Sequence, residues 1–409
     1  MIPVYEKPNR KRRRKKPGRP DGHPGARRAV PDRIDREEHH TLTHCPDCGG
    51  TLGDAVETRT RIIEDLPPVR TVVTRHTIHR YKCPACRKTV EPVVDAALPN
   101  AQIGIRMILW CAWMHFFMGV TIGQLQKWLS AFAAFDVSAG GLTAAWKRLA
   151  QLLKPLYEQL GREARQSDVL HADETGWRVA GRTWWLWCFT NAHLVYFTIA
   201  RSRGSHGVAR VLGKMFGGTL VCDFFGAYNL IVAAAKQRCL VHLFRELEKV
   251  LDRNASAEWA AFAKKLKRLL HDAMRLDARR GETGAEAFDA ARARLLPRLD
   301  ALCAETWRDK DCRRLVKRLS RCRCELFTFV DNPAVTADNN HAERQIRPAV
   351  ILRKNSYCNR SEQGAETQAI LMSLFRTLHL RNADAVETLC ASLKSLIASD
   401  SLLPLPVLS

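Results

Sequence analysis

The segment from residue 169 to residue 241 alternates short apolar runs with helical stretches, and this rhythm limits the fold more than any other feature. The apolar runs predict five strands, at residues 169–172, 184–189, 194–199, 220–222 and 239–241. Helices are expected at 205–215 and 228–235. Three strands, a helix, a strand, a helix and a strand describe an α/β domain with the element order of the ribonuclease H fold.

Two aspartates follow predicted strands of this domain. Asp173 lies at the end of the first strand and Asp223 at the end of the fourth, which are neighbouring positions in such a sheet. Glu343 lies in a later predicted helix at 336–350. Three carboxylates converge only if a cation offsets their repulsion, so the constellation predicts a site for Mg²⁺ or Mn²⁺. Two such ions, roughly 3.5–4 Å apart, would support in-line displacement at a phosphodiester.

Each acidic residue taken alone has an ordinary explanation. An aspartate at a strand end is a common cap, and Glu343 with Arg347 can form a surface ion pair worth about 0.3–0.5 kcal/mol. Only the combination favours a metal site. Glu174 is left out of the triad, because successive residues of a strand point to opposite faces of the sheet.

Positive charge is concentrated at the N-terminus. The chain has 65 Lys and Arg against 42 Asp and Glu, which gives +23, and residues 1–28 contain 11 of the basic side chains. We expect residues 1–40 to be a disordered tail that binds nucleic acid with steeply salt-sensitive affinity; a solvated charge run is the alternative. Residues 17–20 (PGRP) resemble an AT-hook core that would place Arg19 in a minor groove, and a flexible linker explains them equally well.

Two Cys-x2-Cys pairs organise the next segment. Cys45 and Cys48 form the first pair, and Cys83 and Cys86 form the second. Four thiolates can hold one tetrahedral Zn²⁺, so residues 41–98 are expected to form a zinc-binding ribbon in which the metal is structural. A β-hairpin within 62–78 would fill the interval between the pairs. The alternative is two separate turns with free thiols.

Residues 99–165 show helical periodicity. Two helices are expected, separated by a cap-like turn at 136–138. They could form a helix-turn-helix whose second helix presents Lys147 and Arg148 to DNA, and ordinary helix packing explains the same pattern.

The remaining segments complete the predicted organisation. The catalytic core comprises 166–241 and 325–385, interrupted by a basic helical insertion at 242–324 and followed by a C-terminal segment at 386–409. The most apolar run, 107–120, is shorter than the ~20 residues of a membrane span, and no secretory signal is present. These features predict a cytoplasmic protein without a membrane partner, whose 14 cysteines are reduced or metal-bound.

At the acidic residues the sequence resembles the insertion sequence 66 (IS66) family of transposases. The matching stretches are HADETGWRVAGRTWWLWCF from His171, VCDFFGAYN from Val221, CLVHLFRELEKV from Cys239 and NNHAERQIRPAVILRKNSYCNRSEQGAE from Asn339. The KPGRPDGHPG segment and the paired cysteines resemble the family's basic lead and zinc-binding domain.

The resemblance implies a ribonuclease H-like core with an Asp-Asp-Glu triad, carried over as Asp173, Asp223 and Glu343, and a helical insertion before the last of them. It implies a DNA transposase that cleaves double-stranded DNA at element ends and transfers the strand to target DNA. Its implied setting is the nucleoid in the cytoplasm. The implied partners are further copies of the chain on DNA and other proteins encoded by the element.

Four cations surround Glu343 in the sequence: Arg344, Arg347, Arg353 and Lys354. They are interpreted as phosphate contacts, with a solvated helix face as the alternative. Two other functions remain open at this point. The chain could be a zinc-ribbon DNA-binding protein without catalysis, or a nuclease of the same fold that cuts without joining.

Overall fold

The computed structural model describes residues 31–65 and 69–406. The chain divides into two compact units, Met1–Pro68 and Val69–Ser409. In the first unit, the described residues 31–65 contain no helix and no extended strand, and one isolated antiparallel bridge joins His44 to Thr51. Arg19 and most of the predicted basic tail lie outside the described residues.

In the second unit, two short strands flank the second cysteine pair. β1 (Tyr81–Lys82) pairs with β2 (Thr89–Val90), with Tyr81 opposite Val90. The hairpin predicted within 62–78 is wrong for the part of that range that the structure describes, where no strand occurs. Its side chains are largely exposed, so the β-branched residues there have no apolar layer to pack against.

Three helices, rather than the two predicted, precede the sheet. They are α1 (Ile105–Phe116), α2 (Ile122–Ala133) and α3 (Ala139–Arg165). The extra break is made by Gly119, at φ +80°, and by a capping box in which Thr121 and Gln124 bond reciprocally. The turn predicted before the last helix is confirmed, since the Ser138 side chain caps α3 through Gly141 N–H.

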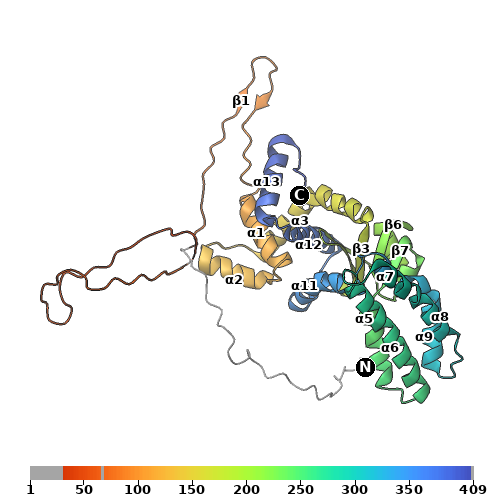
Figure 1. The fold of residues 1–409 in the computed structure, drawn as a ribbon. Coiled ribbons are helices and arrows are strands. Elements are labelled where there is room, and N and C mark those ends of the chain that lie inside the picture. Colours follow the sequence, from red (N-terminus) through yellow and green to blue (C-terminus); the bar gives the residue numbers. More distant parts are fainter. Residues whose placement is uncertain (1–30, 66–68, 407–409) are drawn as a thin grey trace. The chain divides into compact units, whose positions relative to one another are not determined.

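Five strands form one mixed sheet in the order β5-β4-β3-β6-β7 (Figure 1). The strands are β3 (Val169–Val179), β4 (Arg182–Thr190), β5 (Val195–Ala200), β6 (Met215–Cys222) and β7 (Val232–Arg238). β3, β4 and β5 form an antiparallel meander, whereas β6 runs parallel to β3 and β7 parallel to β6. Between the strands lie α4 (Ser205–Leu212) and the 3-10 helix η1 (Gly226–Leu230).

The last strand differs from the sequence prediction. β7 occupies residues 232–235 of the segment expected to be a helix at 228–235, of which residues 228–230 belong to η1. The run expected to be the fifth strand, 239–241, leads into α5 (Leu240–Leu251). Cys239 and Leu240 are fully buried in that position. A three-residue apolar run has the same composition in a buried helix start as in a strand, so periodicity cannot separate the two.

Helices cover both faces of the sheet because its strands alternate two apolar sets. On β4, Leu186 and Cys188 belong to the core shared with α1, α3 and α12, whereas Trp187 and Phe189 face α4 and η1. The helices α11 (Asn340–Ser356) and α12 (Glu362–Leu380) lie on the first of these faces (Figure 1).

The C-terminal helix belongs to this same core. α13 (Ala385–Ser399) packs against α1 and α12, and Leu405 beyond it is buried in the same cluster. The residues predicted as a separate C-terminal segment thus bury apolar side chains together with the catalytic core. Among the described residues, no helix combines the length and the apolar character needed to cross a bilayer.

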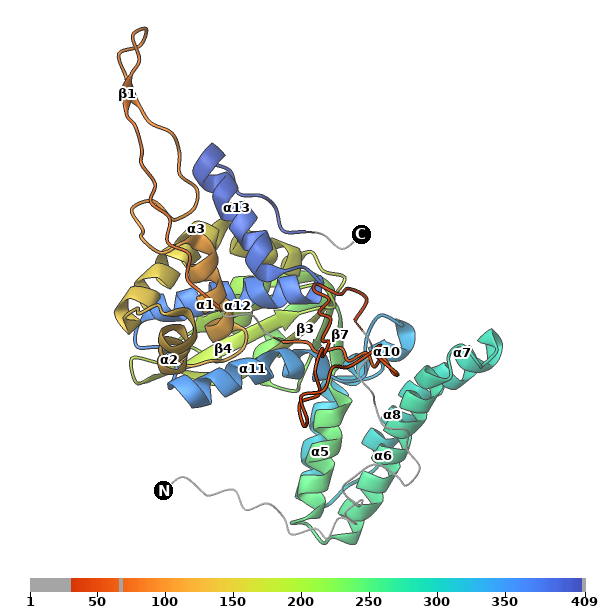
Figure 2. The ribbon, with the colours of Figure 1, turned by 90° about the vertical axis from the view of Figure 1, so that its left-hand side faces the viewer.

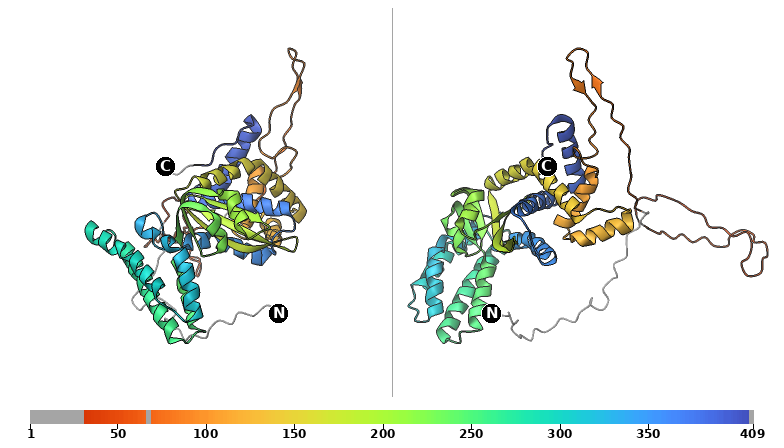
Figure 3. Two further views of the ribbon diagram at one scale, coloured as in Figure 1. Left: turned by 90° about the vertical axis from the view of Figure 1, so that its right-hand side faces the viewer. Right: turned by 180° about the vertical axis from the view of Figure 1, so that it is seen from behind.

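The predicted insertion is a bundle of helices beside β7 (Figures 2 and 3). It contains α5, α6 (Ala257–Ala278), α7 (Ala285–Ala293), α8 (Leu295–Ala304) and α9 (Lys310–Arg321), followed by the short helices η2 (Arg323–Glu325) and α10 (Thr328–Asp331). It has its own core around the buried side chains of Trp259, Phe262 and Leu266.

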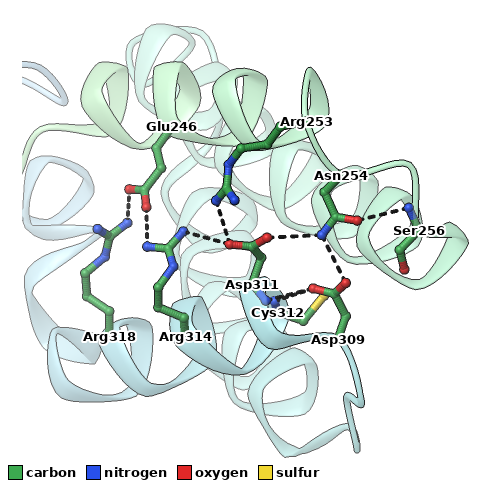
Figure 4. A network of polar contacts seen from close by, with 9 residues as sticks. All are labelled: Glu246, Arg253, Asn254, Ser256, Asp309, Asp311, Cys312, Arg314 and Arg318. Carbon is green, nitrogen blue, oxygen red and sulfur yellow. Dashed lines mark hydrogen bonds and ion pairs between the residues drawn. The ribbon is translucent and has the colours of Figure 1, made fainter. Parts of the chain in front are cut away.

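Charged contacts tie the helices of the insertion together (Figure 4). Glu246 on α5 accepts hydrogen bonds from Arg314 and Arg318 on α9. Asp311, which is 4% exposed, accepts from Arg253 at 2.7 Å and from Asn254 at 3.1 Å. Part of the positive charge of the insertion is thereby used within the protein, where buried carboxylates require such partners.

The close approach of β3 and β6 predicts the effect of one substitution. A Cβ added at Gly218 would lie 2.2 Å from Ser167 O and 2.7 Å from Asp168 O, so Gly218→Ala must force the two strands apart. We expect the free energy of unfolding to fall by about 1–3 kcal/mol, measured by chemical denaturation. The neighbouring Gly217→Ala is the control, because its Cβ meets nothing within 4 Å. Equal effects of the two substitutions would contradict this packing.

Candidate active site

The pairing of β3 with β6 places the two predicted aspartates on neighbouring strands. Val169, Leu170 and His171 pair in parallel with Thr219, Leu220 and Val221. The same 50-residue offset, continued past the last pair, sets Asp173 beside Asp223. Residues at one level of two parallel strands point to the same face, so both carboxylates belong to one site.

Asp173 lies within β3 and not at its end, contrary to the sequence prediction. The strand continues to Val179 because its residues pair with β4 in the meander, whereas its pairing with β6 stops at His171. Asp173 therefore lies just beyond the parallel pairing, where the edge toward β6 is open. The Oδ1 atom accepts the Glu174 N–H at 2.9 Å.

The surroundings of Asp173 disfavour the ionised form of its carboxyl group. Burial, reinforced by the negative charges of Glu174, Asp223 and Glu343, raises the pKa of the Asp173 carboxyl to about 7. All three neighbouring carboxylates thus disfavour ionisation of Asp173. A bound cation would reverse that effect, because it stabilises the ionised form.

Asp223 is held by the turn that follows β6 and by a buried arginine. Its Oδ1 accepts the Phe225 N–H at 2.8 Å. Its carbonyl oxygen accepts from Arg238 Nη1 at 2.8 Å, while Arg238 Nε donates to Glu325 Oε2 at 2.5 Å. Arg238 is 1% exposed at the end of β7, and Glu325 lies in η2 after the insertion. This pair therefore fixes the end of the insertion next to Asp223.

Glu343 is positioned by the first turn of α11. The buried Asn339 side chain donates to Ala172 O at 2.8 Å and lies 3.1 Å from His171 Nδ1, so it attaches the helix start to β3. Glu343 N–H donates to Asn339 O at 3.2 Å, one turn further along. Burial lowers the pKa of His171 to about 4, which keeps the ring neutral and its Nδ1–H available for Asn339.

The Glu343 carboxylate is turned toward Arg245 and His242 of α5. Its Oε1 lies 3.3 Å from Arg245 Nη1 and 3.7 Å from His242 Nε2, and the side chain is 31% exposed. Across residues 31–65 and 69–406, no three His, Cys, Asp or Glu side chains are gathered closely enough to hold a metal ion. Asp223 and Glu343 are both close enough to Asp173 for their charges to raise its pKa, but the three carboxylates do not form a closed site.

The donor set nevertheless suits a hard divalent cation. Carboxylate oxygens are the ligands that Mg²⁺ prefers. Burial raises the pKa of Asp173, and the charges of Glu174, Asp223 and Glu343 raise it further, so several carboxylates lie near one another here. In this arrangement, Arg245 and His242 contact the Glu343 carboxylate. A metal at the aspartates would offer Glu343 a competing partner.

Sequence reasoning missed the residues that support the triad. Asn339, Arg238 and His171 are all buried, and each contacts the backbone or side chain of a distant segment. The sequence signal that could have indicated them is a polar residue at the boundary of a helix or strand. Asn339, for example, lies at the start of a helix, four positions before Glu343. Such residues also occur as ordinary helix caps, so the partner must be known before a role can be assigned.

The four cations predicted to bind phosphates have different environments. Arg344, Arg347 and Lys354 are exposed along α11. Arg353 is half-buried, and its Nη1 donates to Thr175 Oγ1 at 3.1 Å and to Gly176 O. Arg353 therefore attaches α11 to β3. On α3, Lys147 is exposed and Arg148 half-buried.

The two cysteine pairs form the same local turn. Cys45 N–H donates to Gly50 O at 2.8 Å, and Cys83 N–H donates to Lys88 O at 2.9 Å. In each turn the residue four positions after the first cysteine returns its N–H to that cysteine's carbonyl at 2.9 Å and has positive φ: Gly49 at +74° and Arg87 at +56°.

The turn geometry prepares the first cysteine of each pair for metal binding. Backbone N–H groups of Asp47 and Cys48 lower the pKa of Cys45, and those of Cys86 and Ala85 lower the pKa of Cys83. A lowered thiol pKa favours the thiolate, which is the form that binds zinc. The first pair belongs to the unit that ends at Pro68 and the second pair to the other unit.

Two regions of the chain match known protein families. Residues 100–367 match the family described as "Transposase IS66 family", and residues 43–87 match the "zinc-finger binding domain of transposase IS66". The chain belongs to the IS66 transposase family. The matched region includes all three acidic residues, and the zinc-finger match includes all four cysteines of the two pairs.

Longer relatives occur in Sinorhizobium fredii (strain NBRC 101917 / NGR234). The uncharacterized protein y4qI is 26% identical over 92% of this chain and 75% of its own length. The uncharacterized protein y4jD is 23% identical over 87% of this chain and 75% of its own length. Both relatives match this chain over most of its length.

The raised pKa of Asp173 predicts how stability depends on pH. Between about pH 4 and pH 7 the metal-free folded chain holds a proton that the unfolded chain releases, so the free energy of unfolding falls as pH rises, by up to about 4 kcal/mol. Chemical denaturation of the wild type and of Asp173→Asn across this range measures the effect. The variant should lack this component, and identical pH profiles of the two proteins would contradict it.

Proposed function

We propose that this IS66 family member is a DNA transposase with a ribonuclease H-like core, in which Asp173, Asp223 and Glu343 hold Mg²⁺ or Mn²⁺. The observation that supports the proposal is the β3–β6 register, whose last pair, His171 with Val221, lies two residues before Asp173 and Asp223. The order of the sheet, with an antiparallel meander followed by two parallel strands, supports the fold assignment.

Each residue of the proposed site would have its own role. Asp173 and Asp223 provide the paired ligands, Glu343 completes the set from α11, and Asn339 keeps the start of α11 on β3. A divalent ion bound there supplies activation of the attacking oxygen and stabilisation of the leaving one. The overall reaction is hydrolysis at an element end, followed by attack of the freed 3′-hydroxyl on target DNA.

The exposed cations provide a DNA-binding surface near this site. Arg344 and Arg347 lie within one turn of Glu343 on α11, and Lys354 follows on the same helix. Phosphate contacts there would hold the scissile strand close to the carboxylates. Lys147 and Arg148 on α3 remain candidates for a second contact. Assembly of several copies on DNA and a nucleoid location belong to this proposal, as does cooperation with other element-encoded proteins.

We further propose that Cys45, Cys48, Cys83 and Cys86 bind one structural Zn²⁺. The support is the identity of the two turns, each of which presents two thiols from one Cys-x2-Cys pair. Neither pair alone supplies the four ligands of a closed tetrahedral site, so sharing one ion satisfies both. Such a site has no open position for water, and its role would be to fold the DNA-binding ribbon.

Loss of Asp223 tests the catalytic proposal. The assay uses Mg²⁺ and DNA that bears the inverted repeats flanking the gene. Asp223→Asn should lower the cleavage rate by more than about 100-fold. Replacing a residue that only hydrogen-bonds to a metal ligand costs about 10–100-fold, and Asp223 is proposed as a ligand itself. DNA affinity should change by less than about twofold, because phosphate contacts dominate it. Asp289→Asn on the exposed face of α7 is the control.

Three outcomes would alter the proposal. Cleavage by Asp223→Asn at the wild-type rate would show that the triad is wrong. A wild-type protein that binds but does not cleave would indicate a DNA-binding protein without catalysis. Cleavage without strand joining would indicate a nuclease on this fold.

Zinc content tests the ribbon proposal. The wild type should contain one zinc per chain by elemental analysis, and Cys83→Ser should lose most of it because three ligands bind more weakly than four. Cys324→Ser is the matched control, since Cys324 is also exposed but lies in the insertion. Two zinc ions per chain, or full retention by Cys83→Ser, would contradict a shared site.

A further inference from the structure

Glu174 is a buried carboxylate on the opposite face of β3 from the triad. Its side chain is 2% exposed, and it lies on the face of the sheet covered by α4 and η1. Arg203 donates to its Oε1 from Nε at 3.1 Å and from Nη2 at 2.9 Å. Tyr228 O–H donates to its Oε2 at 2.6 Å. Both oxygens are therefore occupied by donors of the chain.

Arg203 is held in place by more than this ion pair. Its guanidinium carbon lies 4.0 Å from the ring centroid of Phe225 and 4.6 Å from that of Trp185. Stacking on two aromatic faces orients the planar group toward Glu174. The geometry differs from that of a surface ion pair between two mobile side chains, because one partner is buried and the other is stacked.

Phe225 and Tyr228 both belong to the segment that directly follows Asp223. Phe225 N–H donates to Asp223 Oδ1, and the Phe225 ring contacts Arg203. Tyr228, which is fully buried in η1, reaches Glu174 from the same segment. Glu174 in turn gives its N–H to Asp173 Oδ1. A continuous set of contacts thus connects the two aspartates behind the sheet.

We propose that Glu174, Arg203 and Tyr228 are positioning residues that fix the distance and orientation of Asp223 relative to Asp173. The inference rests on the proposed function for its link to metal binding. Only the pairs from Val169 to His171 hold β3 to β6 in this region, and that pairing ends before Asp173. The contacts around Glu174 supply the restraint that the missing strand pairing does not.

Removal of one oxygen atom tests this role. Tyr228→Phe leaves a carboxylate oxygen of Glu174 buried without its donor, which should loosen residues 223–230 and weaken Mn²⁺ binding by about 10-fold or more. Arg203→Lys keeps the charge but loses the planar stack and the paired hydrogen bonds, so we expect the same direction of change. Because Arg203 is at the surface, this variant is informative even if Tyr228→Phe folds poorly.

Two measurements on the full chain separate the positioning role from the catalytic proposal. Hydrogen exchange of residues 223–230, measured without metal, should become about 10-fold faster in both variants. Mn²⁺ titration followed by electron paramagnetic resonance gives the metal affinity. The control is Tyr157→Phe, which removes the same atom from a tyrosine that donates to Phe197 O at 2.8 Å, in the core on the other face of the sheet.

The outcomes are distinct. Faster exchange at 223–230 together with weaker Mn²⁺ binding, both absent from Tyr157→Phe, would support the inference. Unchanged exchange at 223–230, or unchanged Mn²⁺ affinity despite faster exchange, would overturn it. A wild-type protein that binds no Mn²⁺ at Asp173 and Asp223 would instead overturn the proposed function, while the exchange result would still report whether the contacts restrain the Asp223 segment.

Discussion

Three residue pairs between β3 and β6 determine the geometry of the whole acidic site. Their register brings Asp173 and Asp223 to the same level on adjacent strands, where like charges repel each other. Burial is the main cause of the raised pKa of Asp173, and the negative charges of Glu174, Asp223 and Glu343 add to it. A fold that maintains such a contact loses stability at that point, and burial of the surrounding sheet has to compensate for it. A site that binds cations gains from the same arrangement, because the repulsion is relieved when the ion enters.

Segments on both faces of the sheet restrain this register. On the triad face, Asn339 attaches α11 to β3. On the other face, where Arg238 is paired with Cys222 and donates to Asn229 of η1, Arg238 connects the Asp223 carbonyl to Glu325 at the end of the insertion. Arg318 of α9 also stacks over Phe224, next to Asp223. The insertion thus does more than extend a basic surface: its last helices contact the loop that carries one of the aspartates.

The sequence predicted what depends on local pattern. Four of the five strands were located because alternating apolar residues mark them, and the aspartates were found because they follow such runs. β7 was misplaced because Val232–Arg238 is an edge strand with little apolar alternation, and the apolar run after it starts a helix. Arg238, Asn339 and Tyr228 could not be assigned roles from sequence, since their partners lie 15, 167 and 54 residues away. The position of Glu174 opposite Asp173 was correctly expected from strand geometry, but its contacts were not.

The central claim is that Asp173 and Asp223 together bind a divalent metal ion. Anomalous diffraction at the manganese edge, from crystals of the full chain grown with Mn²⁺, tests it most directly. We expect a manganese peak in contact with both aspartate carboxylates, with Glu343 turned from Arg245 toward the ion. Manganese bound elsewhere on the chain, with none between Asp173 and Asp223, would contradict it.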